Sequence, residues 1–224
     1  TGKTTTVRRI FSMIREETRQ VVPAHINCRH DHTPLTVYRS IFEQVCGCPA
    51  PSAGRYLDEI RQGIATRLQE RNAALVVCLD DANELIPAGI YNPLLYQLLR
   101  LYEKWDVRKA GVFAVTSDLG LNLYAEADAS VRSVFHPTEI NFPPYTRTEI
   151  REILADRVRQ GLYPRVLPKP LLDRIAAIAA GEQDVRVGID LVRAACLRAE
   201  KDGRRRVSPG DVTAATRAVT APAL

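Results

Sequence analysis

The sequence predicts an α/β fold, in which a parallel sheet is covered by helices on both faces and is followed by a small all-helical domain. Short apolar runs recur along the first 142 residues with helical stretches between them, and strand signals stop after Pro143-Pro144. Strands that are separated by crossover helices run parallel, and parallel sheets are buried on both faces. The chain has 224 residues, which is enough for one substantial core and a small second unit.

Four apolar runs are the candidate strands. They span Val21 to Asn27, Ala74 to Leu79, Gly111 to Thr116, and Ile140 to Phe142. Short runs of this composition between helical stretches are typical of strands in a parallel sheet. Before the third run we expect a helix that Asn92 caps, with Pro93 at its first position and apolar residues at helical spacing: Leu94, Leu95, Leu98, Leu99 and Tyr102.

The chain after residue 144 is predicted to consist of four helices. Thr146 to Glu149 form a capping box at the start of the first, ahead of the apolar positions Ile150, Ile153, Leu154 and Val158. The next three are expected from Pro170 to Gly181, from about Val185 to Lys201, and from Ser208-Pro209 onward. We interpret Arg204 to Arg206 as a solvated turn in preference to a DNA-binding patch. The domains are therefore predicted as 1–144 and 145–224.

The composition limits the class of protein. Lys and Arg exceed Asp and Glu by 31 to 26, a net charge of +5 that permits a polyanionic partner without requiring one. No apolar run approaches the roughly 20 residues that span a bilayer, so no membrane partner is expected. An odd number of scattered cysteines favours a reducing cytoplasm. One group of side chains could be interpreted as a metal cluster, but its spacing matches no structural zinc pattern: Cys28, His30, His32, Cys46 and Cys48.

The first five residues form the back half of a phosphate-binding loop, G-x-x-x-x-G-K-[ST], and they lead directly into a helical pattern. Gly2 lets the backbone approach phosphate oxygens, and Lys3 balances the charge of the β- and γ-phosphates. Thr4 offers its hydroxyl to Mg²⁺ at the N-terminus of a helix. The first glycine of the motif would precede Thr1, so we expect the natural protein to begin upstream and to supply it.

An acidic strand end supports this interpretation. The run from Leu75 to Leu79 is followed by Asp80 and Asp81, at the place where such ATPases carry a metal-holding Asp and a water-activating acid. Alone, the two carboxylates could form a simple capped turn. Together with the lysine of the loop, they predict a site for ATP and Mg²⁺, with Thr4 and Asp80 at the metal.

Further segments occur in a specific order along the chain: I-N-C-R, V-T-S-D-L at 115–119, E-I-N-F-P-P-Y at 139–145 and D-V-R-V-G-I-D-L at 184–191. With T-G-K-T and the acidic strand end, they make nearly the whole chain resemble the AAA+ ATPases of the archaeal and eukaryotic origin-recognition and replication-initiation family. The F-P-P-Y hinge and the following arginine-bearing segment are the most discriminating part, because many ATPases share the first two motifs.

The resemblance implies a P-loop AAA+ core in residues 1–144 and a helical lid in residues 145–224. It assigns Thr1 to Thr5 to the phosphate loop, Asp80 to Mg²⁺ and Asp81 to hydrolysis.

In the lid, the resemblance places Tyr145 and Arg157 along the nucleotide pocket and Arg186 at the γ-phosphate, a position often called sensor 2. A guanidinium there would couple the lid to the third phosphate. The alternative for Arg186 is an ordinary exposed charge on a helix.

Three departures from the family pattern affect hydrolysis. Asp81 replaces the usual Glu, and a displacement of about 1 Å can cost roughly a hundredfold in rate. Ser117 stands where the family has Asn, and we expect this smaller side chain not to reach the attacking water. Ser130 stands where an arginine is expected, which leaves Arg132 as the candidate finger into a neighbouring subunit. We therefore expect a protein that binds ATP and changes shape but hydrolyses it slowly.

Family members contact DNA through a helical insertion and through a winged-helix domain after the lid. The insertion should fall near Cys48 to Arg61, where Arg55 and Arg61 would meet phosphates, although a plain surface loop remains the alternative. Because Leu224 follows the fourth predicted helix of the lid directly, we expect these 224 residues to contain no winged helix.

The expected function is that of an initiator that recognises double-stranded origin DNA and helps to load the replicative helicase, with a second initiator subunit as a further partner. Its expected place is the archaeal cytoplasm, at the nucleoid, or the nucleus if the source is eukaryotic. The alternatives are a clamp loader or transposition-helper ATPase, and a nucleotide-binding module that no longer hydrolyses.

Overall fold

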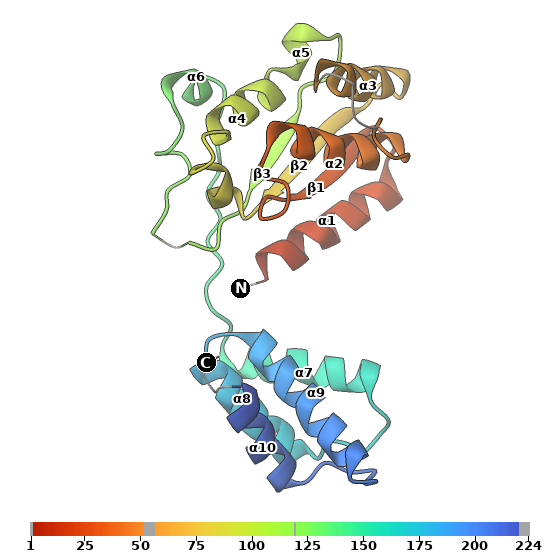
Figure 1. Ribbon diagram of the computed structural model, residues 1–224, viewed down its shortest axis with the longest axis vertical. Helices are drawn as coiled ribbons and strands as arrows, with labels where there is room; N and C mark the ends of the chain where they lie inside the picture. The colour runs from red at the N-terminus through yellow and green to blue at the C-terminus, as the bar shows by residue number, and fades with distance from the viewer. Residues whose placement is uncertain (1, 52–56, 119, 220–224) are drawn as a thin grey trace. The chain divides into compact units, whose positions relative to one another are not determined.

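The computed structural model describes residues 2–51, 57–118 and 120–219 (Figure 1). Contacts divide the chain into two compact units, one formed by Gly2–Ile140 and one by the chain from Asn141 onward. Within the described ranges, no helix is both long enough and apolar enough to cross a bilayer.

The first unit is organised by a three-stranded parallel sheet in the order β1 (Val21–Asn27), β2 (Ala74–Asp80) and β3 (Gly111–Ala114). The register pairs Val21 with Ala74 and continues to Asn27 opposite Asp80. The first three predicted strands are confirmed, although β3 ends two residues earlier than the sequence predicts. The carboxyl ends of β1 and β2 therefore meet at one edge, and the predicted acidic residues lie there.

Helices cover both faces of this sheet, which confirms the predicted fold class. On one face, α1 (Lys3–Glu17) packs Val7 and Phe11 against Cys78 and Val115. The other face is covered by α2 (Pro34–Cys46), α3 (Leu57–Glu70) and α4 (Tyr91–Leu99), whose apolar side chains form one core with alternate residues of β1 and β2 (Figure 1). Because side chains alternate along a strand, Asp80 belongs to the α1 face together with Cys78.

Two local predictions are wrong. Residues 140–142 form no strand, and Ile140 is 67% exposed, because a three-residue apolar run carries too little pairing energy to define a strand without a neighbour.

Asn92 does not cap α4, which begins at Tyr91 after Ile90. Its carboxamide instead donates to the carbonyl oxygen of Glu126 at 3.0 Å and accepts from the N–H of Asp128 at 2.8 Å. The helix also ends at Leu99, and Tyr102 lies in the short helix α5 (Leu101–Lys104). The loop segments of this unit add a 3-10 turn, η1 (Ala82–Leu85), and a short helix, α6 (Ala129–Arg132).

The second unit contains the four predicted helices, α7 (Arg147–Gly161), α8 (Lys169–Gly181), α9 (Val185–Lys201) and α10 (Pro209–Val219). The predicted capping box is present: Thr146 Oγ1 accepts from the N–H of Glu149 at 3.3 Å, and Glu149 Oε2 accepts from the N–H of Thr146 at 2.8 Å. That second bond lowers the pKa of Glu149. The helices enclose one apolar core, which includes Ile150, Leu154, Ile175, Leu191 and Val212.

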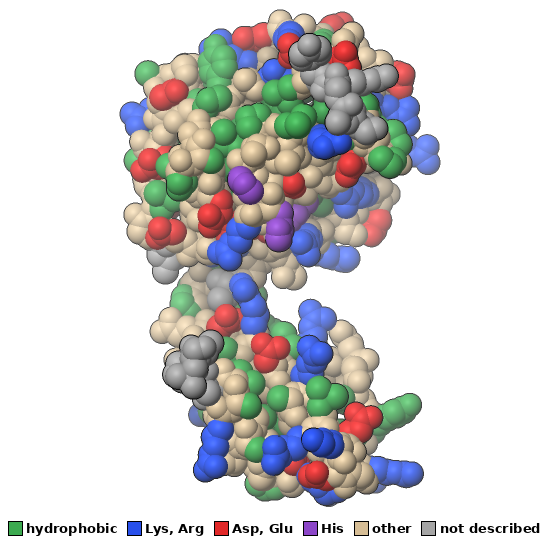
Figure 2. All heavy atoms as spheres, viewed as in Figure 1, with side chains coloured by type: hydrophobic (Ala, Val, Ile, Leu, Met, Phe, Trp, Pro, Cys, Tyr) green, Lys and Arg blue, Asp and Glu red, His purple; other side chains and the backbone are tan. Residues whose placement is uncertain are grey.

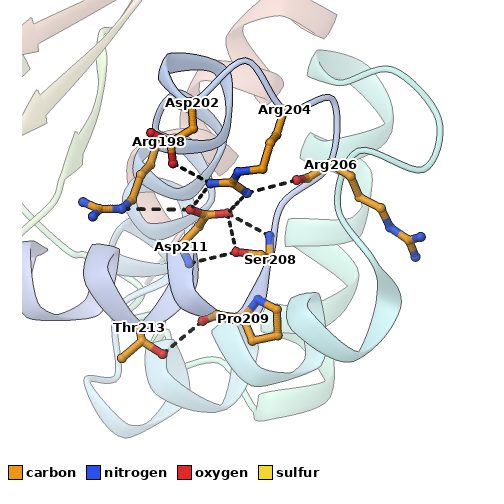
Figure 3. Close-up of polar contacts among 8 residues, drawn as sticks. All are labelled: Arg198, Asp202, Arg204, Arg206, Ser208, Pro209, Asp211 and Thr213. Carbon is orange, nitrogen blue, oxygen red and sulfur yellow. Dashed lines mark hydrogen bonds and ion pairs between the residues drawn. The ribbon is translucent and has the colours of Figure 1, made fainter.

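The turn between α9 and α10 differs from the prediction at Arg204. Its guanidinium donates to both carboxylate oxygens of Asp211, at 2.6 and 2.7 Å, and to Asp202 at 2.8 Å (Figure 3). Asp211 is only 2% exposed and also accepts from the N–H and Oγ of Ser208, at 2.8 and 2.7 Å. Hydrogen bonds from Arg204 hold the pKa of Asp211 well below its usual range. Arg204 is thus part of the fold, whereas Arg205 and Arg206 are exposed as predicted.

Candidate nucleotide site

The described part of the phosphate loop begins at Gly2, whose φ of 83° lies in the left-handed region that favours glycine. Lys3 is the first residue of α1, and the first turn of this helix contains no acidic side chain. Unpaired N–H groups and the helix dipole make such an end favourable for phosphate. Thr5 is exposed beside it, and Thr1 lies outside the described residues.

The two halves of the predicted metal site come together. Thr4 Oγ1 donates to Asp80 Oδ1 at 3.1 Å, although 76 positions separate the residues in the sequence. Asp80 is 8% exposed at the end of β2. A hydroxyl and a carboxylate are hard oxygen donors of the kind that Mg²⁺ prefers, and Mg²⁺ commonly takes its remaining ligands from phosphates and water. Over the described ranges, no group of three or more His, Cys, Asp and Glu side chains is placed to hold a metal, so this pair would rely on the nucleotide.

The second acid, Asp81, has a left-handed backbone conformation with φ of 54° and is held from two sides. Ser117 Oγ donates to its Oδ1 at 3.2 Å, and Arg29 Nε lies 2.9 Å from its Oδ2. Arg29 is also 3.9 Å from Glu84 Oε1. Because the Arg29 side chain is 59% exposed, its ion pair contributes little stability and can be displaced. The structure thus brings Ser117 and Asp81 together, and it adds a cation that sequence reasoning did not assign.

His25 is a further residue of this site that the motifs did not indicate. It lies on β1, and its Nε2 is 3.2 Å from Asp80 Oδ2, although the contact does not have the geometry of a hydrogen bond. Burial is the main cause that lowers the pKa of His25, and Asp80 opposes this effect. The alternation of side chains along β1, combined with the pairing of Asn27 with Asp80, is the signal that could have placed His25 beside the acid.

Arg132, the candidate finger, is folded onto its own loop. Its Nη2 donates to the carbonyl oxygen of Ala125 at 2.7 Å, and its guanidinium carbon lies 5.7 Å from the centre of the Tyr124 ring. Ser130 donates to Asp128 Oδ1 at 2.6 Å, and the same carboxylate oxygen caps α6. Arg132 is exposed, so it would have to leave these contacts to reach a neighbouring subunit.

The three lid candidates belong to the second unit. Tyr145 packs against the apolar core of that unit. Arg157 is exposed and donates to Gln160 Oε1 at 3.2 Å. The Arg186 side chain is 87% exposed, and its Nε is 3.8 Å from the Asp184 carboxylate that caps α9. The Arg186 guanidinium is therefore accessible to an anionic ligand.

The predicted DNA-contacting insertion is only partly described, because Arg55 lies in the segment 52–56 outside the described residues. Arg61 belongs to α3, and its side chain is only 12% exposed. Its guanidinium stacks 4.9 Å from the centre of the Tyr38 ring and forms a 3.2 Å ion pair with Asp58. This geometry makes Arg61 a packing residue and a poor contact for phosphate.

Comparison with known families gives two matches along the chain. Residues 1–117 match a family described as "AAA domain", and residues 151–217 match the "Cdc6 AAA+ ATPase-type lid domain". The chain belongs to the ORC1/Cdc6-type family of AAA+ proteins. The predicted resemblance to the origin-recognition family is confirmed, and with it the combination of an AAA+ core and a helical lid.

Named relatives support the same family. The ORC1-type DNA replication protein 2 of Methanothermobacter thermautotrophicus is 42% identical over 202 residues, which are 90% of this chain and 53% of that protein. The ORC1-type DNA replication protein 3 of Haloarcula marismortui is 38% identical over 216 residues, or 96% of this chain and 57% of that protein. The chain thus spans a little over half the length of these relatives.

Solved structures of ORC proteins are similar in fold. The Aeropyrum pernix ORC1 protein in complex with DNA has a TM-score of 0.81 and 28% identity, covering 97% of this chain and 56% of its own. The Aeropyrum pernix ORC2 protein, described as ADPNP-ADP complexes, has a TM-score of 0.82 and 26% identity, covering 98% of this chain and 59% of its own.

Proposed function

We propose that the chain is the ATP-binding part of a replication initiator, and that ATP with Mg²⁺ acts mainly as a conformational switch. The contact between Thr4 and Asp80 carries this proposal, because it joins the phosphate loop to the acidic strand end. Family membership supports nucleotide binding with a divalent metal.

In the proposed complex, Lys3 and the first turn of α1 bind the phosphates, and Thr4 and Asp80 hold Mg²⁺. Mg²⁺ would neutralise the negative charge that develops on the phosphates. Arg186, with Tyr145 and Arg157, would add contacts from the lid, so that lid position depends on the third phosphate.

Nucleotide binding is tested by thermal unfolding of the full-length protein. A non-hydrolysable ATP analogue with Mg²⁺, at about 100 times its dissociation constant, should stabilise the site by about 2.7 kcal/mol. Lys3→Ala should abolish this stabilisation, whereas the control Lys169→Ala, on α8 in the lid, should retain it. Equal stabilisation of both variants would contradict the assignment of Lys3.

Slow hydrolysis is proposed because Asp81 is one methylene shorter than the family's Glu, and because Arg29 Nε lies 2.9 Å from its Oδ2, so that an attacking water has to compete with Arg29 for this oxygen. In single-turnover assays, Asp81→Glu should raise the hydrolysis rate by more than about threefold, since a displacement of about 1 Å can cost far more than this. Ser117→Asn is the companion variant, because it restores the family's residue at the other contact of Asp81. A smaller rise with Asp81→Glu shows that the shortened acid does not limit the rate.

Origin DNA and the replicative helicase are the proposed partners of the whole protein. A relative was solved in complex with DNA, and the chain carries a net charge of +5. On the face of the molecule in Figure 2, Lys and Arg side chains lie at several places among Asp and Glu. We therefore expect this chain to bind the phosphates of the DNA backbone weakly, without strong preference for a DNA sequence.

The salt dependence of DNA affinity tests this mode of binding. Two phosphate contacts predict a loss of about tenfold between 50 and 200 mM salt. An affinity that stays constant over this range excludes binding dominated by phosphates.

The ion pair between Arg29 and Asp81 favours a second candidate function, that of a nucleotide-binding module that no longer hydrolyses ATP. Multiple-turnover assays separate the two candidates, because the module would show no turnover above the rate of a Lys3→Ala variant.

A further inference from the structure

The carboxylate of Asp80 has a different neighbour at each oxygen. On the α1 side, Thr4 Oγ1 donates to Oδ1 at 3.1 Å. On the β1 side, His25 Nε2 lies 3.2 Å from Oδ2. A carboxylate that is contacted at both oxygens has a defined rotation about its Cβ–Cγ bond, so the second contact determines where the first oxygen points.

The backbone of His25 is held in place by a side chain of α2. The carboxamide of Gln44, on α2, accepts from the N–H of His25 at 2.9 Å and donates to its carbonyl oxygen at 2.9 Å. The side chain is only 14% exposed. The two bonds fix the backbone of His25 on β1, and from this position the ring reaches the carboxylate of Asp80.

The Nε2 atom of His25 is buried and has no hydrogen-bond partner of good geometry. A buried donor without a partner is unfavourable, and a small rotation of the ring or of the carboxylate would turn the 3.2 Å contact with Oδ2 into a hydrogen bond. Asp80 Oδ2 is thus the nearby acceptor for a hydrogen bond from this ring.

We propose that His25 is a positioning residue for Asp80: its Nε2–H donates to Oδ2 and turns Oδ1 toward Thr4 and the Mg²⁺ of bound ATP. The inference rests on the proposed function, since it concerns the metal site of the nucleotide. Hydrogen-bond partners behind a metal ligand commonly change metal affinity by about 10- to 100-fold when they are removed. His25 acts only through Asp80 and touches neither the metal nor the nucleotide.

The experiment measures Mg²⁺ dependence separately from nucleotide affinity. Binding of a fluorescent ATP analogue to the full-length protein is followed while Mg²⁺ is titrated, and again in EDTA. His25→Phe keeps a ring of similar shape without a donor, and His25→Leu is a second apolar replacement. His25→Gln returns an N–H donor near the position of Nε2. His136→Phe, which replaces an exposed histidine after α6, is the control.

We expect the Mg²⁺ concentration at half-saturation to rise about 10- to 100-fold in His25→Phe and His25→Leu and to stay within about threefold of wild type in His25→Gln. The affinity for the ATP analogue in EDTA, and the melting temperature without nucleotide, should remain at wild-type values in all three His25 variants. A purely structural role would lower both of these instead.

Several outcomes overturn the inference while the proposed function survives. One is wild-type Mg²⁺ dependence in both apolar variants, and another is an equal rise in His25→Gln. Loss of folding in all three variants would also overturn the inference, because such a loss would show that His25 has a packing role. If wild-type protein binds no nucleotide with Mg²⁺, the proposed function fails and the inference fails with it.

Discussion

Replacing Asp211 with asparagine removes the charge around which the turn between α9 and α10 is organised. The wild-type carboxylate accepts two hydrogen bonds from Arg204 and two from Ser208, all between 2.6 and 2.8 Å (Figure 3). An asparagine at the same place has one acceptor oxygen and turns an NH₂ group toward the guanidinium or toward Ser208. Donors would therefore face donors within a site that is 2% exposed.

The size of the stability loss depends on the environment of the Arg204 guanidinium that the substitution leaves without its main partner. Breaking a buried ion pair costs about 3–5 kcal/mol when the remaining charge stays unpaired in the interior. Here the remaining charge is partly hydrated, because the Arg204 side chain is 37% exposed and keeps Asp202 as a partner. We therefore expect a loss of about 2–3 kcal/mol in the free energy of unfolding, close to that of a hydrogen bond to a charged group in a buried place.

Urea unfolding of the chain at pH 7, followed by circular dichroism at 222 nm, measures this loss. Asp202→Asn is the matched control, since it removes the exposed partner of the same guanidinium and should cost less than about 1 kcal/mol. Trp105 is the single tryptophan and lies in the first unit, so its fluorescence should report an unchanged transition. A difference of less than about 0.5 kcal/mol between the two variants would refute the reasoning, because it lies within the scatter of ordinary surface substitutions.

The pH dependence has a defined sign. Asp211 has a folded-state pKa below its unfolded value, so its stabilisation is complete above about pH 3.9 and is lost as the pH falls below this value toward the folded-state pKa. The stability difference between wild type and Asp211→Asn should therefore shrink below about pH 4. A difference that is constant from pH 7 to pH 3 would exclude the charge as its source.

Three further predictions concern single contacts within the two units. A Cβ on Gly188 would lie 2.8 Å from Leu154 Cδ1, so Gly188→Ala should lower the free energy of unfolding in urea by about 1–3 kcal/mol. The double variant with Leu154→Ala should lose less stability than the sum of the two single variants, because the smaller side chain makes room for the Cβ. Arg61→Ala should lower stability through lost stacking on Tyr38 and leave DNA affinity within about twofold, whereas a phosphate contact would lose more than that in a binding titration. Tyr91→Phe removes a 2.8 Å hydrogen bond to a loop carbonyl oxygen and should lower the free energy of unfolding by about 1 kcal/mol. Unchanged stability of this variant in the same urea assay would contradict the prediction.

Local signals in the sequence predicted most of the fold. The helix from Val185 to Lys201 has the predicted bounds because Asp184 caps it and its apolar residues repeat at helical spacing. The short run from Ile140 to Phe142 lacked such support, and the hydrophobicity of three residues cannot distinguish a strand from an exposed linker. Asn92 illustrates the same limit, since its carboxamide binds a loop that starts more than thirty residues later.

The candidate site was predictable where a motif fixes both the residue type and its role. The phosphate loop and the acidic strand end predicted that Thr4 and Asp80 would meet, and their side chains do so. His25 and Arg29 belong to no such motif, and their contacts depend on how β1 is placed beside β2. The ion pair of Arg204 was not predicted for a related reason, because its partner Asp211 lies on the following helix.

The contact of Gln44 with β1 has a consequence for solubility. In the described sheet, β1 is an outer strand, and the unpaired amide groups of an outer strand can recruit a strand from another molecule. The Gln44 carboxamide occupies both backbone groups of His25 as a neighbouring strand would, so it closes the middle of this edge to intermolecular pairing. A chain with alanine at this position would be expected to self-associate as concentration rises while its fold remains intact.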